Sequence, residues 1–201
     1  MSKKLSAGSD KRVEIMTSIK SICLFCGSSN EVEKKYLDLA DELGTYIASH
    51  GYRLVYGGGG VGLMGAAARA AYQAKGEVLG IMPRFLLQKE RIFDDVEHRI
   101  VDTMHERKQM MYEESDAFIV LPGGIGTLEE AVEVLSWARL NLHAKPMAFL
   151  DSGEFWKPFF ELMDHIVKGR FTPAEFLDQF THTTSPEQAV RALEDRFVQL
   201  K

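Results

Sequence analysis

The segment of the sequence with the clearest chemical potential is residues 122–130, which read Pro-Gly-Gly-Ile-Gly-Thr-Leu-Glu-Glu. It leaves an apolar run, turns on Gly123, Gly124 and Gly126, and is predicted to enter a helix at Thr127. Backbone N–H groups and the helix dipole at such an entry favour an anion, and the Thr127 hydroxyl adds a donor. We therefore expect this loop to bind an anion.

Thr127 and Glu130 also allow a purely structural interpretation. Their spacing, T-x-x-E, is that of a capping box, in which Glu130 only closes onto the backbone of Thr127. Capping alone, however, does not need glycine at positions 123, 124 and 126. The pattern therefore favours a functional loop over simple capping.

A second group of chemically useful residues is found at positions 103–108, Thr-Met-His-Glu-Arg-Lys. Thr103 and Glu106 form a predicted capping box, so Arg107 and Lys108 fall just beyond the first turn of a helix. Arginine offers a planar fork for phosphate or carboxylate, and lysine offers a mobile point charge. Alone, two basic residues usually form a solvated face. After a strand at 98–101 they can instead lie at the same sheet edge as the glycine loops.

Glycines at positions 57–60 and 62 form another loop between an apolar run and a helical segment. Glycine permits positive φ and lets backbone N–H groups approach a phosphate. We interpret the loop as a phosphate or ribose contact, with a tight strand-to-helix turn as the alternative. A nicotinamide cofactor fits less well, because its glycine loop should follow the first strand. The predicted phosphate or ribose contacts are Ser28, Gly58, Gly59, Gly60 and Gly123.

The histidines and cysteines do not suggest a metal site. The six histidines show no ligand spacing. Cys23 and Cys26 are predicted to lie within a strand, where buried structural thiols are expected rather than a redox pair. We therefore expect no metal and a reducing, cytoplasmic setting.

The elements that must position these residues follow from the order of apolar segments. Runs at 22–26, 54–56, 78–82, 118–121 and 147–150 do not alternate with polar residues, which predicts strands covered on both faces. Segments with helical spacing separate them, and a last helix opens at Ser185 with proline next. The sequence thus predicts an α/β fold, a Rossmann-like doubly wound parallel sheet in a single domain of residues 17–201. Ligands should bind beyond the carboxyl ends of its strands.

Composition narrows the choice of partners. The formal net charge is −5, from 24 basic and 29 acidic side chains, which argues against duplex nucleic acid as a partner. No apolar run approaches the ~20 residues that a membrane span needs, so we expect no membrane partner. Residues 1–16 contain lysine and arginine without a following apolar segment, and we expect a disordered tail or a late start codon rather than a signal peptide.

Taken together, four motifs resemble the Lonely Guy family. They are residues 25–29 (FCGSS), 56–65 (YGGGGVGLMG), 104–108 (MHERK) and 122–130 (PGGIGTLEE), and the resemblance runs from about residue 19 to residue 197. Members of this family are cytokinin riboside 5′-monophosphate phosphoribohydrolases, often mislabelled lysine decarboxylases. The resemblance implies hydrolysis of the N-glycosidic bond of adenine or N6-substituted adenine nucleoside 5′-monophosphates, giving free base and ribose 5-phosphate.

By resemblance, Arg107 and Glu130 are the catalytic pair, and no cofactor is needed. The implied substrate-binding residues are Glu90, Arg107, Lys108, Gly124, Ile125, Gly126, Thr127, Leu128, Glu129, Glu130 and Ser136. Two departures from the plant members, serine at 136 and the segment 85–96, bear on the preferred base. Position near a helix N-terminus should favour the charged form of Glu130. Whether Arg107 holds the phosphate, the ribose or Glu130 is left open by the sequence.

Two further expectations concern function class and assembly. A non-catalytic nucleotide or cofactor carrier of the same fold is the competing hypothesis, and an Arg and a Glu at both motif positions favour the enzyme. Trp137, Leu140 and Leu142 flank a helix end and exceed what the core needs, which predicts a self-complementary interface and a homodimer, the common state in the family.

Overall fold

One parallel sheet organises the protein. The computed structural model describes residues 18–88 and 91–199, so the expected tail at 1–16 lies outside the described residues. Seven strands lie in the order β4-β3-β2-β1-β5-β6-β7, and every neighbouring pair is parallel. The strands are β1 (Ser21–Phe25), β2 (Arg53–Tyr56), β3 (Val78–Pro83), β4 (Glu97–Val101), β5 (Ala117–Val120), β6 (Met147–Leu150) and β7 (Phe180–Thr183).

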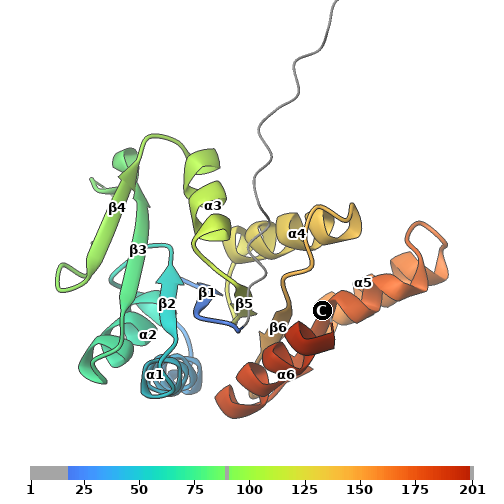
Figure 1. The fold of residues 1–201 in the computed structure, drawn as a ribbon, viewed down its shortest axis with the longest axis horizontal. Coiled ribbons are helices and arrows are strands. Elements are labelled where there is room, and N and C mark those ends of the chain that lie inside the picture. The colour runs from blue at the N-terminus through green and yellow to red at the C-terminus, as the bar shows by residue number, and fades with distance from the viewer. Residues whose placement is uncertain (1–17, 89–90, 200–201) are drawn as a thin grey trace, which may run out of the picture.

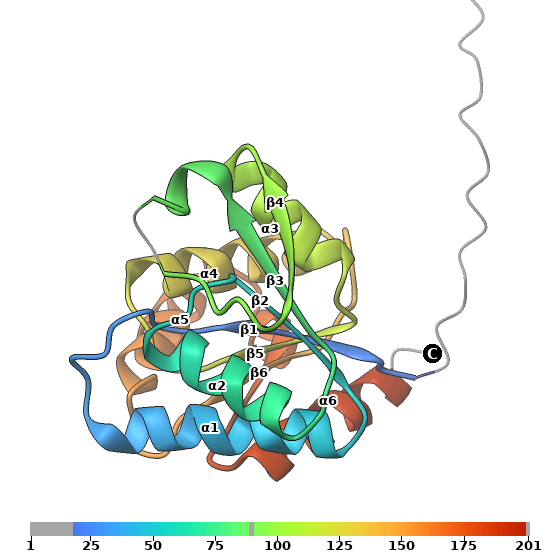
Figure 2. The same cartoon turned by 90° about the vertical axis from the view of Figure 1, so that its left-hand side faces the viewer.

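Helices cover both faces of this sheet, as Figures 1 and 2 show. The helices α1, α2 and α6 pack on one face, and α3, α4 and α5 on the other. They are α1 (Lys34–Ser49), α2 (Gly62–Gln73), α3 (Met104–Glu113), α4 (Ile125–Arg139), α5 (Lys157–Lys168) and α6 (Pro186–Gln199), with short 3-10 turns η1 (Arg84–Leu86) and η2 (Ala174–Gln179). Within the described residues, none of these helices combines the length and apolarity needed to cross a membrane. The predicted α/β doubly wound sheet is confirmed.

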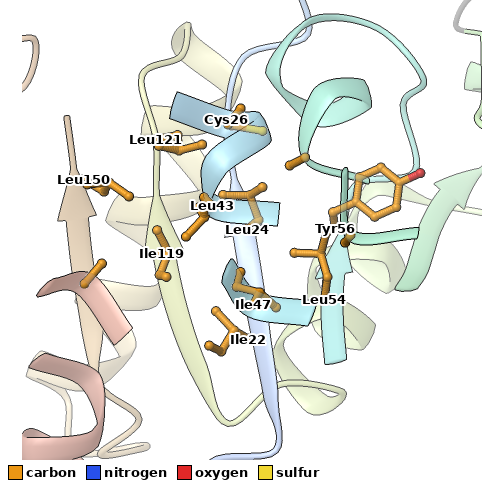
Figure 3. Close-up of a cluster of buried hydrophobic side chains, with 14 of the residues drawn as sticks. Ile22, Leu24, Cys26, Leu43, Ile47, Leu54, Tyr56, Ile119, Leu121 and Leu150 are labelled. Carbon is orange, nitrogen blue, oxygen red and sulfur yellow. The ribbon is translucent and has the colours of Figure 1, made fainter. Parts of the chain in front are cut away.

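The core explains why the central strands lack alternation. All five residues of β1 are buried, because helices cover both of its faces. In Figure 3, side chains of β1, β2, β5 and β6 gather with Leu43 and Ile47 of α1 to form one of the two apolar layers. Both cysteines are buried and free, as expected, although Cys26 lies just past the end of β1 rather than within it.

Strand β7 was not predicted from the sequence. It reads Phe-Thr-His-Thr, only Thr183 in it is buried, and it forms the outer edge of the sheet beside β6. A short, half-polar edge strand lacks the apolar run by which a strand is predicted from sequence. Its pairing depends on contacts with a partner about thirty residues earlier in the chain, such as Met147 with Phe180.

The chain changes direction across the sheet between β1 and β5. Strands β1 to β4 progress toward one edge, and β5 returns to the other side of β1. Just beyond these two strands, the N–H of Gly27 donates to the carbonyl of Pro122 at 3.0 Å. Ligands of open α/β sheets bind at such switch points, beyond the carboxyl ends of the strands. The loops after β1 and β5 should therefore carry the functional site.

Candidate active site

Helix α3 brings Arg107 into the site. The predicted capping box is confirmed: the N–H of Glu106 donates to Oγ1 of Thr103 at 3.1 Å, and the N–H of Thr103 donates to Oε2 of Glu106 at 3.2 Å. This cap fixes where the helix begins and therefore which way its next turn points. In α3, Arg107 and Met111 are the two buried residues. A solvated arginine, the structural alternative, is thereby ruled out at position 107.

Three contacts hold the guanidinium of Arg107. Its Nε donates to the carbonyl of Ile81 at 3.1 Å, its Nη2 to the carbonyl of Gly57 at 3.3 Å, and its Nη1 to Oε1 of Glu130 at 2.8 Å. Glycine is required at 57, because a Cβ there would overlap Nη2 of Arg107. The sequence left open what Arg107 holds. In the structure it holds Glu130 and is itself tied to the ends of β2 and β3.

Helix α4 begins two residues earlier than expected. Its first residue is Ile125, its N-cap is Gly124, and no side chain caps it. Thr127 is therefore inside the first turn, and the alternative interpretation of Thr127 and Glu130 as a capping box does not hold. Glu130 instead faces Arg107 from beyond the first turn. The capping explanation for Glu130 is thus removed.

Glu130 is a buried carboxylate, 8% exposed. Burial raises the pKa of its carboxyl above the ordinary value, and the positive charge of Arg107 opposes that rise. The expectation that a helix N-terminus favours the charged form is wrong here. The dipole acts mainly within the first turn, and desolvation is the larger influence at this position. A carboxylate of raised pKa is a stronger base than an ordinary glutamate, so it is suited to accepting a proton from water.

These groups line one cavity at the predicted edge of the sheet, about 360 Å³ in volume. Such a volume lies within the range of small-molecule sites. Segments following β1, β2 and β3 form its walls together with the first turns of α2, α3 and α4. The lining residues are Leu24, Cys26, Gly27, Ser28, Gly57, Met64, Leu86, Met104, Arg107, Gly124, Ile125, Gly126, Thr127 and Glu130.

Two glycines of this wall are not explained by packing. A Cβ at Gly124 or Gly126 would meet no protein atom within 4 Å, and neither residue has positive φ. By contrast, a Cβ at Gly123 would overlap Oγ1 of Thr127, so Gly123 is needed for packing. Glycine at 124 and 126 keeps space open in front of the uncapped N–H groups of α4. That geometry favours an anion at this helix end.

The glycine loop at 57–62 has a different role from the one predicted. Gly58, Gly59 and Gly60 do not line the cavity, and the N–H of Gly60 donates to the carbonyl of Arg91 at 2.6 Å. A Cβ at Gly60 would lie 2.7 Å from the carbonyl oxygen of Ile92. The first N–H groups of α2 are also taken. Asn30 accepts from Gly62, and the carbonyl of Gly27 accepts from the next two residues. A close backbone contact therefore accounts for Gly60, and a positive φ of 83° accounts for Gly58.

The remaining expected site residues lie at varied distances from the cavity. Lys108 and Glu129 pair with each other, and Leu128 packs partly buried in the apolar layer of α3, α4 and α5. Ser136 is exposed and lines a separate cavity of about 220 Å³ together with residues of α5 and η2. Glu90 lies outside the described residues. The structure thus brings Ser28, Arg107, Glu130 and residues 124–127 together.

The sequence did not single out several residues of the cavity wall. They are Leu24, Cys26, Met64, Leu86 and Met104. Most lie within or next to the recognised motifs, so proximity to a motif was the available signal. Leu86, in the turn η1 that follows β3, had no such signal.

A larger cavity, about 570 Å³, lies at the opposite edge of the sheet. It is lined by residues before β1, β2, β3 and β5, where parallel α/β folds do not place their ligands. Its lining mixes basic and acidic side chains without a buried reactive pair. We therefore assign the functional site to the smaller cavity, because that cavity contains the buried pair of Arg107 and Glu130. Across residues 18–88 and 91–199, no cluster of three or more His, Cys, Asp or Glu side chains could hold a metal ion.

Comparisons with known proteins identify relatives of this chain. A family model described as "Possible lysine decarboxylase" matches residues 64–193. A cytokinin riboside 5′-monophosphate phosphoribohydrolase from Arabidopsis thaliana is 40% identical over 184 residues, covering 91% of this chain and 86% of that protein. One from Oryza sativa subsp. japonica is 42% identical over 159 residues, covering 79% of this chain and 66% of that protein.

Solved structures show the same fold at lower identity. The molybdenum cofactor binding protein from Rippkaea orientalis superposes with a TM-score of 0.69 at 23% identity, covering 90% of this chain and 98% of that one. The molybdenum cofactor carrier protein from Chlamydomonas reinhardtii gives a TM-score of 0.68 at 22% identity, covering 89% and 98%. At these identities the likeness shows the Rossmann-like fold alone.

Proposed function

The chain belongs to the Lonely Guy family, and from this premise we propose that it hydrolyses purine nucleoside 5′-monophosphates. The bond cleaved is the N-glycosidic bond of an adenine or N6-substituted adenine nucleotide, and the products are free base and ribose 5-phosphate. One observation carries the proposal: the buried pair of Arg107 and Glu130 in a cavity wall that also contains the uncapped start of α4.

The 5′-phosphate binds at the N-terminus of α4 in this proposal. The open space at Gly124 and Gly126 supports it, because those glycines serve no packing purpose in the protein itself. A helix N-terminus offers N–H donors and a partial positive charge to a phosphate. Phosphate contacts of this kind would supply binding energy that accelerates cleavage at the more distant glycosidic bond.

Glu130 acts at the glycosidic bond. Cleavage develops positive, oxocarbenium-like charge on the ribose, and a nearby carboxylate stabilises that charge. Water then bonds to the ribose carbon as the base leaves. Glu130 accepts a proton from that water and passes it to the departing base, so the carboxylate is regenerated. The raised pKa of Glu130 supports this role as a base, and Arg107 keeps the carboxylate in place.

A molecule of the same fold can also bind a nucleotide-like cofactor without turning it over, as the names of the two carrier-type structures say of those proteins. Identities below 25% carry no function across to this chain. The buried acid–base pair is what favours the enzyme, because a carrier has no need of a buried carboxylate held against an arginine. Burying such a pair costs desolvation energy and contributes little net stability, which favours a functional over a purely structural role.

The experiment that separates enzyme from carrier is incubation of the purified protein with AMP and with an N6-isopentenyl AMP. We expect base and ribose 5-phosphate to accumulate in equal amounts from at least one of them. Adenosine should be a far poorer substrate, because it lacks the phosphate. Binding of AMP without release of base would support the carrier, and equal rates with adenosine and AMP would contradict the phosphate site on α4.

We propose further that the protein forms a homodimer through the outer face of α4 and the residues just after it. Leu140 is 63% exposed and Leu142 is 67% exposed, more apolar surface than a solvated helix end needs. Trp137 is half-buried against Tyr112 and contributes less than expected. Ser136 is exposed on this face, so contact with a substrate would require one bound to the partner. Light scattering at micromolar concentration tests the proposal, and a monomer would contradict it.

A further inference from the structure

The contact between α3 and α4 is largely ionic where it borders the cavity. Nζ of Lys108 donates to Oε1 of Glu129 at 2.6 Å and to Oε1 of Glu133 at 3.0 Å. The Lys108 side chain is only 16% exposed. Partial burial works against its charge, but these two carboxylates raise the pKa of Lys108 above the ordinary value. Lys108 is therefore a charged residue engaged by α4.

The position of these partners in the helix is informative. Glu129 and Glu133 are one helical turn apart, and Glu130 lies between them in sequence. Two neighbouring residues of α3 thus form ion pairs with α4. Arg107 pairs with Glu130, and Lys108 pairs with Glu129 and Glu133 on either side of it in the sequence. Arg107 lines the active cavity and Lys108 does not. The Lys108 ammonium contacts Glu129 and Glu133 of α4 instead.

Packing alone does not fix Glu130. A small cavity of about 10 Å³ lies beside its side chain and is lined by Phe25, Lys108, Glu130, Glu133, Val134 and Trp137. Close-packed cores hold side chains by contact on every side, and a gap on one side removes that constraint. The ionic contacts between α3 and α4 are therefore available to hold the carboxylate toward the active cavity.

We propose that Lys108 is a positioning residue that acts on the reaction through α4, by clasping Glu129 and Glu133 so that Glu130 stays aligned against Arg107 in the cavity wall. Its kinetic readout rests on the proposed hydrolase function. The proposal differs from the resemblance-based expectation, in which Lys108 binds the substrate. If Lys108 positions Glu130, removing its charge should lower kcat and leave KM unchanged. If Lys108 binds the substrate, the same change should raise KM and leave kcat unchanged.

The test is a set of variants at this clasp. Lys108→Met keeps the length of the side chain and removes its charge, Lys108→Arg keeps the charge, and Glu133→Gln removes one partner. Since displacements of about 1 Å can cost about 100-fold in rate, we expect Lys108→Met to lower kcat by about 10- to 100-fold while KM stays within about twofold. Lys108→Arg should restore most of kcat. Lys168→Met, which breaks an exposed ion pair on α5, is the matched control and should change neither.

A double variant separates positioning from a general loss of stability. If Lys108 and Glu133 act as one unit, Lys108→Met combined with Glu133→Gln should be little worse than Lys108→Met alone. Multiplied effects on kcat would contradict the clasp. A rise in KM with unchanged kcat for Lys108→Met would overturn the proposal in favour of direct substrate binding, and an unchanged kcat and KM would overturn it outright.

A second readout does not depend on turnover. The groups that act on the Glu130 carboxyl are Arg107 and Lys108 from α3, which lower its pKa, and Glu129 of its own helix, which raises it. The thiols of Cys23 and Cys26 are neutral, because burial raises their pKa. Carbon-13 NMR titration of the Glu130 carboxyl, assigned by its loss in Glu130→Gln, should therefore show a higher pKa in Lys108→Met than in the wild type.

This readout keeps the two proposals apart. If the wild type releases no base from any nucleotide, the proposed function fails, and the titration still decides whether Lys108 acts on Glu130. An identical titration in wild type and Lys108→Met would overturn the clasp even in a protein that is an active hydrolase.

Discussion

Replacing Glu130 by glutamine tests the centre of the proposed mechanism with the smallest change in shape. The amide keeps an oxygen that can accept from Nη1 of Arg107, where the carboxylate accepts at 2.8 Å. It removes the negative charge and the ability to take a proton. Because the N-cap of α4 is Gly124 and no side chain caps that end, the substitution leaves the start of the helix untouched.

The expected kinetic effect is large. Removing one preorganised electrostatic group from an active site costs about 100- to 1,000-fold in kcat, or roughly 2.7–4 kcal/mol. Glu130 has two roles here, charge stabilisation and proton acceptance, so we expect a loss at the upper end of that range. AMP affinity should change little, because the Gly124–Thr127 backbone proposed to bind phosphate is unaffected.

The expected effect on stability is much smaller. Removing one partner of a buried ion pair outright, as in Glu130→Ala, destabilises by roughly 3–5 kcal/mol. In Glu130→Gln the hydrogen bond survives, and Arg107 keeps its contacts with the carbonyls of Ile81 and Gly57, so the cost should be well below that. For a domain of this size each 1 kcal/mol lowers Tm by roughly 2–4 °C. A fall of a few degrees is expected for the glutamine variant and a markedly larger one for alanine.

The assay is base release from AMP, or from N6-isopentenyl AMP if that is the better substrate, measured beside nucleotide affinity and Tm on the same preparations. Loss of turnover with near-normal affinity and Tm would support the catalytic role of Glu130. Near-normal turnover in Glu130→Gln would refute it and leave the carboxylate as a structural partner of Arg107.

Three further predictions concern the same site. Arg107→Lys keeps the charge but replaces the three nitrogens that separately reach Ile81, Gly57 and Glu130 by a single ammonium, so turnover should fall about 100-fold or more with folding intact by circular dichroism. Gly57→Ala should abolish turnover, because the added methyl would overlap the Arg107 guanidinium. Gly124→Ala should fold with a normal Tm and show a raised KM, because its methyl meets no protein atom but enters the proposed phosphate site. Equal kinetics for the two variants would contradict the assigned roles. Because burial raises the pKa of Glu130 and the carboxylate is the active form, kcat/KM should fall as pH drops through a value above the ~4.3 of an ordinary glutamate. That limb should be missing from the residual rate of Glu130→Gln.

The fold could be predicted from the sequence because its signals are local. Five continuous apolar runs separated by helical spacing indicate a parallel sheet, and all five form strands. The capping box at Thr103 correctly predicted the first residue of α3. Strand β7 was not predicted, because a short polar edge strand depends on pairing with its neighbour β6 rather than on its own composition.

The roles of the site residues were harder to predict from the sequence, because those roles depend on contacts between segments that are far apart in the chain. The glycines at 57–60 resemble a phosphate loop, yet Gly60 is required by the carbonyl of Ile92, in a segment with no recognisable pattern. Thr127 and Glu130 match a capping box in spacing, yet the helix starts at Ile125, because Gly124 provides its N-cap. In the first case a long-range contact decides what the glycines do, and in the second the helix begins two residues before the residue that the local pattern indicates.

The way Arg107 is tied has a consequence for thermal inactivation. Its guanidinium is bonded to the carbonyl of Ile81 within β3 and to that of Gly57 directly after β2, so the reactive pair is anchored in the backbone of the sheet. Sites carried by mobile loops lose their geometry in local openings well below the global transition. Here the position of the Arg107 guanidinium persists for as long as β2 and β3 remain in register. Heating should therefore abolish activity and secondary structure at the same temperature, with no inactive but folded state in between.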